Sequence, residues 1–271
     1  MLGGKRIGFI GAGNMGDALI RGLLASKLVT AQDLLAYDAA QSRLEHLQAA
    51  HGVAAARGNR ELAQACDIVV LCVKPQVVEA VLDELEGMPR DRLLISICAG
   101  ITLEQLETRL PMQPVIRVMP NTPALVLEGA SALAKGMHAT VEHLAVARAI
   151  FDAVGRTVVV EERLMDAVTG LSGSGPAYVF TIIEALADAG VNLGLARPQA
   201  QELAAQTCLG AARMLLSGGA SPGELKAMVT SPGGTTIRGL QVLERAGLRG
   251  ILMDAVEAAA KRSRKLGRKK A

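Results

Sequence analysis

A glycine-rich loop, Gly11-Ala12-Gly13-Asn14-Met15-Gly16, joins an apolar strand-like run to a helical segment near the start of the chain. Its first glycine allows a tight turn, the second lets a ligand approach the backbone, and the third lets the helix pack closely on the strand. Unpaired N–H groups at the start of such a helix attract phosphate. In this context the loop predicts a dinucleotide-binding βαβ unit, with all six residues at the ligand.

Residues 5–160 alternate short β-rich runs with amphipathic segments, a pattern typical of a sheet covered by helices on both faces. Strands are predicted at residues 6–10, 34–37, 68–73, 93–97, 115–119, 130–133 and 157–160, and helices between them include 14–24 and 141–154. The fold class predicted for residues 1–161 is therefore α/β, a Rossmann-type, doubly wound parallel sheet.

After Glu161 the β-rich runs disappear, and Ala, Leu, Glu and Gln dominate between Pro and Gly residues. Helices are predicted at about residues 177–189, 198–216, 223–229, 235–246 and 248–266. Residues 162–271 should therefore form an all-α domain. Because Ala-rich helix faces bury little area each, we expect this domain to pack against a second copy of itself in a homodimer.

Hydrophobic residues make up 50% of the 271-residue chain, but no apolar run approaches the roughly 20 residues that span a bilayer. The first ten residues lack the pattern of a secretory signal, so we expect a cytoplasmic protein without a membrane partner. Cys66, Cys72, Cys98 and Cys208 are widely separated. Their spacing predicts free thiols, with neither a metal site nor a disulfide framework.

The net charge of +3 conceals a basic run at the end of the chain. The run consists of Lys261, Arg262, Arg264, Lys265, Arg268, Lys269 and Lys270. Without these seven residues, 22 basic and 26 acidic residues give the body a charge of −4. Such a run binds nucleic acid or anionic lipid in some proteins, but it is more often a solvated helix end whose cations complement the helix dipole. We adopt the second interpretation and expect no nucleic-acid partner.

Several polar or small residues follow predicted strands, where ligands bind in doubly wound folds. Asp38 ends the second predicted strand, where a carboxylate binds the adenosine ribose of NADH and disfavours a 2′-phosphate, although Arg43 offers a 2′-phosphate a partner instead. Val73, Lys74 and Pro75 end another apolar run, and Lys74 there would offset phosphate charge. The remaining loop residues leave room for a nicotinamide ring and are Ala99, Gly100 and the run Pro120-Asn121-Thr122-Pro123.

The turn Ser231-Pro232-Gly233-Gly234-Thr235-Thr236 precedes a helical run in the second half. Its glycines expose backbone N–H groups and its hydroxyls add donors, which together form a receptor for a carboxylate. An N-cap is the alternative interpretation, but one Ser or Thr would suffice for a cap. The similar segment at residues 171–176 is interpreted as a turn or an interdomain hinge.

None of the four histidines, His46, His51, His138 and His143, ends a predicted strand, so no histidine is placed for proton transfer to a carbonyl. A 3-hydroxy acid dehydrogenase would have to use Lys226 as its base. An imine needs less help, because its own nitrogen carries the proton. A protein that only senses the dinucleotide is the third alternative.

Four runs and the 231–236 turn together resemble the pyrroline-5-carboxylate reductase family nearly end to end. The runs are residues 8–16, Val73-Lys74-Pro75, Met119-Pro120-Asn121-Thr122-Pro123 and residues 166–178. The last run and the 231–236 turn are the most specific, since many dehydrogenases share the glycine loop. The resemblance implies NADPH- or NADH-dependent reduction of 1-pyrroline-5-carboxylate to L-proline, the last step of proline biosynthesis.

The resemblance also implies roles for individual residues. The substrate carboxylate would bind Ser231, Gly233, Gly234 and Thr235, and Thr236 would contact the ring nitrogen as the catalytic residue. Asn59, in a loop, would touch the adenosine portion of the cofactor, and Glu162 matches an acidic residue near the cofactor. Members form dimers, often assembled into larger rings. Asp38 departs from the neutral or phosphate-accepting residue of many members, so the choice between NADPH and NADH stays open.

Overall fold

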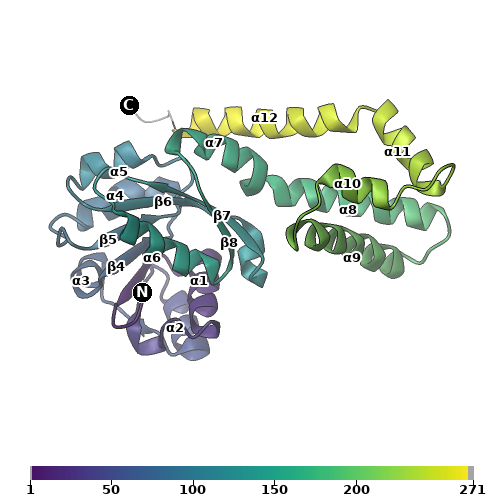
Figure 1. The fold of residues 1–271 in the computed structure, drawn as a ribbon. Coiled ribbons are helices and arrows are strands. Elements are labelled where there is room, and N and C mark those ends of the chain that lie inside the picture. Colours follow the sequence, from purple (N-terminus) through teal and green to yellow (C-terminus); the bar gives the residue numbers. More distant parts are fainter. Residues whose placement is uncertain (1, 268–271) are drawn as a thin grey trace. The chain divides into compact units, whose positions relative to one another are not determined.

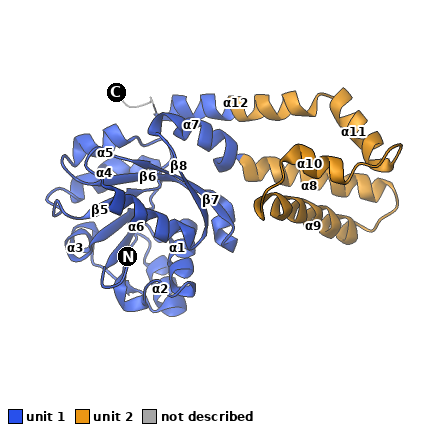
Figure 2. Ribbon diagram, viewed as in Figure 1, with its two compact units in different colours: residues 1–174, 258–271 blue, residues 175–257 orange. Residues whose placement is uncertain are grey.

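The computed structural model describes residues 2–267, so Arg268, Lys269 and Lys270 of the basic run lie outside the described residues. The chain divides into two compact units, one formed by residues up to Ser174 together with those from Ala258, the other by Gly175–Glu257 (Figure 2). In chain order the first unit contains β1 (Ile7–Ile10), α1 (Asn14–Ala25), η1 (Ala31–Asp33), β2 (Leu34–Tyr37), α2 (Gln41–His51), β3 (Ala54–Ala55), α3 (Asn59–Ala65), β4 (Ile68–Leu71), η2 (Pro75–Val77), α4 (Val78–Glu84), β5 (Leu93–Ser96), α5 (Leu103–Arg109), β6 (Val115–Met119), η3 (Thr122–Val126), β7 (Gly129–Lys135), α6 (Val141–Asp152), β8 (Gly155–Val159), η4 (Glu162–Leu164), α7 (Met165–Val168) and η5 (Thr169–Gly173). The second unit contains α8 (Gly175–Asn192), α9 (Arg197–Leu216), α10 (Pro222–Met228), α11 (Thr235–Arg245) and the beginning of α12 (Leu248–Gly267).

The first unit is built on an eight-stranded sheet with the order β3-β2-β1-β4-β5-β6-β7-β8. The predicted α/β class is confirmed, but the sheet is not wholly parallel, because β7 runs antiparallel to β6. The connection at residues 120–128 contains only η3 and is shorter than the dozen or more residues that a crossover to a parallel strand requires. β8 then pairs in parallel with β7 at the edge of the sheet.

Both faces of this sheet are covered by helices (Figure 1). Because successive strand residues point to opposite faces, Phe9 and Val70 pack with α1, α2 and α6, whereas Val69 and Leu94 pack with α3, α4 and α5. All four side chains are fully buried. The central strands β1, β4 and β5 are therefore fully buried and mostly apolar, which made them clear in the sequence. Seven strands were predicted to within two residues at each end. The alanine pair of β3 was missed because it is too short to form a pattern.

The second unit is entirely helical, as predicted, and its small core consists of Ala187, Ala200 and Ala204 between α8 and α9. Larger apolar side chains of this unit lie on its surface, among them Phe180, Leu203, Val242 and Met253. The alanines permit close helix approach but remove little apolar area from water. The unit thus buries only small side chains in this core and exposes several large apolar ones.

The two compact units divide after Ser174, and the domain boundary predicted between residues 161 and 162 stays a prediction. Met165 of α7 is buried in the core on one face of the sheet, so the segment that follows β8 belongs with the first unit. The segment at residues 171–176 was predicted to be a turn or an interdomain hinge. It is not a simple turn, because η5 is a π-helical turn that leads into α8, but the division between the two units does fall within it, after Ser174. Between residues 2 and 267 no helix is both long and apolar enough to cross a membrane.

Candidate active site

The glycine loop, residues 11–16, has the geometry that its three glycines predict. Gly11 follows β1 with a φ of +100°, and a Cβ there would lie 2.7 Å from the carbonyl oxygen of Cys72. A Cβ on Gly16 would lie 2.5 Å from the carbonyl oxygen of Gly11. Larger residues would therefore force the loop away from the neighbouring strand or from α1.

The N-terminus of α1 is open to a ligand. Its N-cap is Gly13, and among the described residues no side chain caps it. The nearest atom to a Cβ built on Gly13 is Nη1 of Arg43, at 3.5 Å. A cavity of about 310 Å³, here called the phosphate cavity, is lined by Ala12, Gly13, Asn14, Asp17, Arg21, Ser42, Arg43, His46 and Leu125. Open N–H groups and two guanidinium groups make it suitable for a pyrophosphate.

Asp38 follows β2 and holds the glycine loop through its carboxylate. Oδ2 accepts a hydrogen bond from the N–H of Ala12 at 2.7 Å, and Oδ1 accepts one from the N–H of Ala40 at 2.8 Å. Arg43 donates a long hydrogen bond of 3.4 Å to the carbonyl oxygen of Ala12. The structure therefore places a carboxylate and a guanidinium, with opposite preferences for a 2′-phosphate, at the same loop.

Asn59 is the first residue of α3 rather than a loop residue, and only 4% of it is exposed. Its Nδ2 donates a hydrogen bond to Glu84, but its buried Oδ1 has no hydrogen-bond partner within residues 2–267. An orphaned buried oxygen costs about 1–3 kcal/mol. A ligand hydroxyl or amine that donates to Oδ1 would remove this cost, so Asn59 fits a nucleotide contact.

The loops after β4 and β5 meet at the carboxyl edge of the sheet, as predicted. Lys74 is exposed there, and Gly100 has a φ of +77°. A second cavity of about 440 Å³, here called the edge cavity, is lined by Pro75, Gln76, Glu79, Ala99, Gly100, Ile101, Gln105, Thr169, Ser174, Ala259, Arg262, Ser263, Leu266 and Gly267. Its size lies within the range of small-ligand sites.

Cys98 lies beside this edge but is not a reactive thiol. Burial raises its pKa to about 11, although hydrogen bonds with Ser96 and Val73 oppose the shift. Burial also raises the pKa of Cys72 well above its usual value. At neutral pH both groups are therefore uncharged, so neither acts as a base or a nucleophile.

Glu162 and Asn121 contact the protein itself. Oε1 of Glu162 accepts hydrogen bonds from the N–H of Leu103 at 2.6 Å and from Nη1 of Arg117 at 2.9 Å. Asn121 joins two segments, because its Nδ2 donates to the carbonyl oxygen of Ser172 and its Oδ1 accepts from the N–H of Ala130. These side chains stabilise the walls of the site, and their predicted cofactor contacts rest on the resemblance alone.

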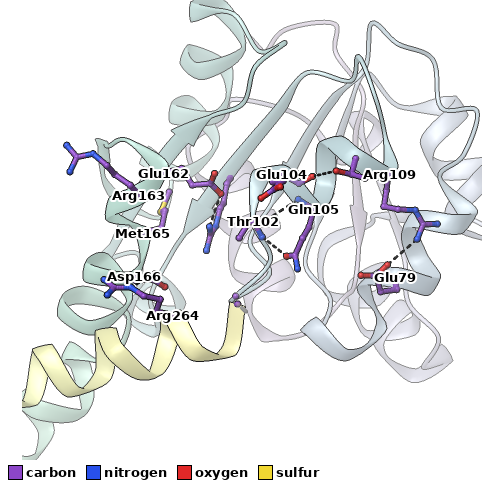
Figure 3. Close-up of a pocket in the computed structure, with 14 residues that line it drawn as sticks. Glu79, Thr102, Glu104, Gln105, Arg109, Glu162, Arg163, Met165, Asp166 and Arg264 are labelled. Carbon is purple, nitrogen blue, oxygen red and sulfur yellow. Dashed lines mark hydrogen bonds and ion pairs between the residues drawn. The ribbon is translucent and has the colours of Figure 1, made fainter. Parts of the chain in front are cut away.

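Arg117 and Glu162 both line a third cavity, of about 750 Å³. Figure 3 shows this cavity and labels Glu162. Glu79, Thr102, Gln105, Arg109, Asp166 and Arg264 also line this ionic cavity. Arg117 was not among the residues predicted from the sequence. The available signal was a charged residue inside an otherwise apolar strand, and only 8% of its side chain is exposed. A buried guanidinium requires an acidic partner, and here Glu162 provides it.

The 231–236 turn lies in the helical unit, directly before α11. Gly233 has a φ of +67°, and the N–H of Gly234 donates to the carbonyl oxygen of Ser231 at 3.1 Å. The N-cap is Gly234, and within the described chain no side chain caps α11. The turn is therefore not the elaborate Ser/Thr cap considered above. It presents open N–H groups beside the hydroxyls of Ser231, Thr235 and Thr236.

The structure thus brings the glycine loop, Asp38 and Asn59 into one unit, together with the edge residues Lys74 and Gly100. It adds Arg21, Ser42 and His46 to the phosphate cavity, three residues that local sequence patterns did not indicate. They come from the outward faces of α1 and α2, where polar residues are ordinary. Only the folded arrangement of the two helices reveals that they line one cavity.

Two family models match the chain. "Pyrroline-5-carboxylate reductase dimerisation" covers residues 162–266, and "NADP oxidoreductase coenzyme F420-dependent" covers residues 6–100. The chain is similar to a pyrroline-5-carboxylate reductase of Methanosarcina acetivorans, with 49% identity over 98% of this chain and 99% of the relative. A relative with the same name from Escherichia coli is 42% identical over 97% and 99% of the two chains.

Solved structures agree with these relatives. A pyrroline-5-carboxylate reductase from Coxiella burnetii matches with a TM-score of 0.93 and 37% identity, over 97% of this chain and 98% of that one. A Plasmodium falciparum pyrroline carboxylate reductase with NADP bound matches with a TM-score of 0.85 and 34% identity, over the same shares. More distant dehydrogenases, such as a 3-hydroxyisobutyrate dehydrogenase at 19% identity, share the fold alone.

Proposed function

Because the chain belongs to the pyrroline-5-carboxylate reductase family, we propose that it reduces 1-pyrroline-5-carboxylate to L-proline and that the 231–236 turn binds the substrate. The observation that carries this assignment of the turn is the uncapped start of α11. Open N–H groups at a helix start, with hydroxyls beside them, bind a small carboxylate.

The cofactor is NADPH or NADH, and its proposed site is the glycine loop with the residues around it. Gly11, Ala12, Gly13, Asn14, Met15 and Gly16 would hold the pyrophosphate, helped by the guanidinium groups of Arg21 and Arg43. The unpaired Oδ1 of Asn59 would accept from the adenosine portion. Val73, Lys74, Pro75, Ala99 and Gly100 would border the nicotinamide half. When bound, the reduced nicotinamide supplies the hydride.

The proposed substrate contacts divide between anchoring and chemistry. Ser231, Gly233, Gly234 and Thr235 orient the carboxylate, and the hydroxyl of Thr236 hydrogen-bonds the ring nitrogen. The imine carbon gains a hydride and the nitrogen retains one proton, so the C=N bond becomes the C–N bond of a secondary amine. Orientation and one hydrogen bond suffice, because no protein base has to remove a proton from carbon or oxygen.

The apolar surface of the helical unit supports a homodimer formed through residues 162–266, as the name of the family model also suggests. A larger ring is compatible with this assembly. Cys66 and Cys98 are buried free thiols, and Cys72 and Cys208 are partly buried free thiols, which supports a reducing compartment such as the cytoplasm.

The activity is tested by following NADPH or NADH absorbance with 1-pyrroline-5-carboxylate and, separately, with a panel of 3-hydroxy acids and the oxidised cofactors. We expect turnover with the imine only. Thr236→Ala should lower kcat/KM by about 10- to 100-fold, the usual effect of losing a hydrogen bond made in the transition state. Thr207→Ala, in α9, is the matched control and should change kcat/KM less than twofold.

Turnover of a 3-hydroxy acid without turnover of the imine would favour the dehydrogenase alternative, in which Lys226 is the base. Lys226 is exposed in the last turn of α10. Cofactor binding without any turnover would favour the sensor alternative. An unchanged kcat/KM for Thr236→Ala would remove Thr236 from the mechanism while leaving the reaction itself established.

A further inference from the structure

The first four residues of the basic run are exposed at the end of α12, as predicted, but this end of the helix also packs on the carboxyl edge of the sheet. A Cβ built on Gly267 would lie 3.2 Å from the carbonyl oxygen of Gly100. Gly100 follows β5, one of the two strands whose loops border the edge cavity. The basic end of α12 is therefore part of the first unit, next to the proposed nicotinamide position.

Asp166 of α7 holds this end of the helix in place. Its Oδ1 accepts a hydrogen bond from Oγ of Ser263 at 2.7 Å. Its Oδ2 lies 3.7 Å from Nε of Arg264, and Figure 3 shows these two side chains beside each other. Ser263 is only 7% exposed. These contacts hold the backbone at Ser263 and Arg264, and with it the preceding position from which Arg262 extends.

Arg262 is exposed and lines the edge cavity. Within residues 2–267 the nearby carboxylate of Asp166 pairs with Arg264, and no carboxylate lies within ion-pair distance of Arg262. The other charged residue of the lining, Glu79, pairs with Arg109 at 3.1 Å. Arg109 also pairs with Asp83 and lies 3.9 Å from Glu86. Acidic groups thus outnumber basic ones on the α4 side of the cavity, and Arg262 is the positive charge of the described lining.

We propose that Arg262 draws the anionic imino acid into the edge cavity and contacts its carboxylate on the way to, or within, the reacting complex. This inference rests on the proposed function. A guanidinium at a cavity mouth raises the local concentration of an anion and binds a carboxylate through its planar fork. The pyrophosphate is not the intended partner, because Arg21 and Arg43 line the separate phosphate cavity.

The test compares Arg262→Gln with the wild type in steady-state kinetics. We expect KM for 1-pyrroline-5-carboxylate to rise about 5- to 20-fold, in the range of one lost charge-assisted hydrogen bond, while kcat and KM for the cofactor change less than twofold. Raising the ionic strength from about 0.05 to about 0.5 M should reduce the difference in this KM between Arg262→Gln and the wild type. Arg262→Lys should have a KM for 1-pyrroline-5-carboxylate close to that of the wild type, because the positive charge is kept.

Lys265→Gln is the matched control, since Lys265 lies on the same end of α12 but lines neither the edge cavity nor the ionic cavity. It should leave KM within twofold of the wild type. If both variants raised this KM equally, the effect would come from the overall positive charge of the helix end, and the specific role of Arg262 would be overturned. A raised KM for NADPH or NADH, or no change at all in Arg262→Gln, would also overturn it.

A binding measurement separates failure of this inference from failure of the proposed function. Titration calorimetry of L-proline into the full-length protein with oxidised cofactor should show weaker binding to Arg262→Gln, whereas its melting temperature should match the wild type. If the wild type neither turns over the imine nor binds L-proline, the proposed function itself fails. If the wild type turns over the imine and binds L-proline, and Arg262→Gln does so with the same KM and affinity, only the role of Arg262 fails.

Discussion

At the scale of single residues, the same side chain often holds the fold and faces the ligand. Asp38 holds the glycine loop through two backbone N–H groups, and it also sets the charge where the adenosine ribose is expected. Asn59 is buried, and its Nδ2 donates a hydrogen bond to Glu84, whereas its Oδ1 has no partner among the described residues. Glu162 was expected near the cofactor from the resemblance, and in the structure its carboxylate forms an ion pair with Arg117.

The charge of Asp38 should determine cofactor preference. We expect Asp38→Ser to raise the ratio of kcat/KM for NADPH to that for NADH by about tenfold, equivalent to about 1.4 kcal/mol, by relieving repulsion of the 2′-phosphate. Steady-state kinetics with both cofactors measures the ratio. Asp33→Ser, at the opposite end of β2, is the control and should leave it unaltered. If Asp38→Ser also leaves it unaltered, Asp38 does not read the ribose.

At the scale of elements, close approach decides where glycine is required. Gly22 lies in the middle of α1, where alanine would form a better helix by about 1 kcal/mol. A Cβ there would lie 2.8 Å from the carbonyl oxygen of Ala153 and would also meet Val154. Packing between α1 and the end of α6 therefore overrides helix propensity at this position.

Gly22→Ala should consequently destabilise the protein by about 1–3 kcal/mol in spite of the gain in helix propensity, because the added methyl group overpacks the contact. Urea unfolding monitored by circular dichroism gives the change in free energy. Gly58→Ala is the matched control, since nothing lies within 4 Å of a Cβ at that position and its φ is extended. It should shift the free energy by less than about 0.5 kcal/mol. Equal stability of Gly22→Ala and the wild type would contradict the tight contact.

At the scale of the whole molecule, the two units differ in how they bury apolar side chains. The first unit buries large side chains on both faces of one sheet. The helical unit buries three alanines and leaves residues such as Phe180 (64% exposed) and Met253 (71%) on its surface. Exposed apolar area of this kind marks an interaction surface, which supports the proposed dimer.

The chain should therefore have at least twice its monomer mass in solution by light scattering coupled to size exclusion. Leu203→Glu places a charge on the apolar surface of α9 and should raise the dimer dissociation constant by at least tenfold. Gln201→Glu adds the same charge at an exposed polar position of α9 and should have little effect. A Leu203→Glu variant that stays as dimeric as the wild type would exclude this part of α9 from the interface.

The sequence alone determined the features that depend on neighbours along the chain. The glycine loop, the strands as apolar runs, the change to a helical second half and the 231–236 turn all carry local patterns, because period and turn chemistry are local properties. Only the tertiary structure decided the direction of β7, the return of α12 to the first unit, the Arg117–Glu162 pair and the position of Arg262 at the edge cavity. These features join residues far apart in sequence, so the packing of whole elements, which no local pattern records, determines them.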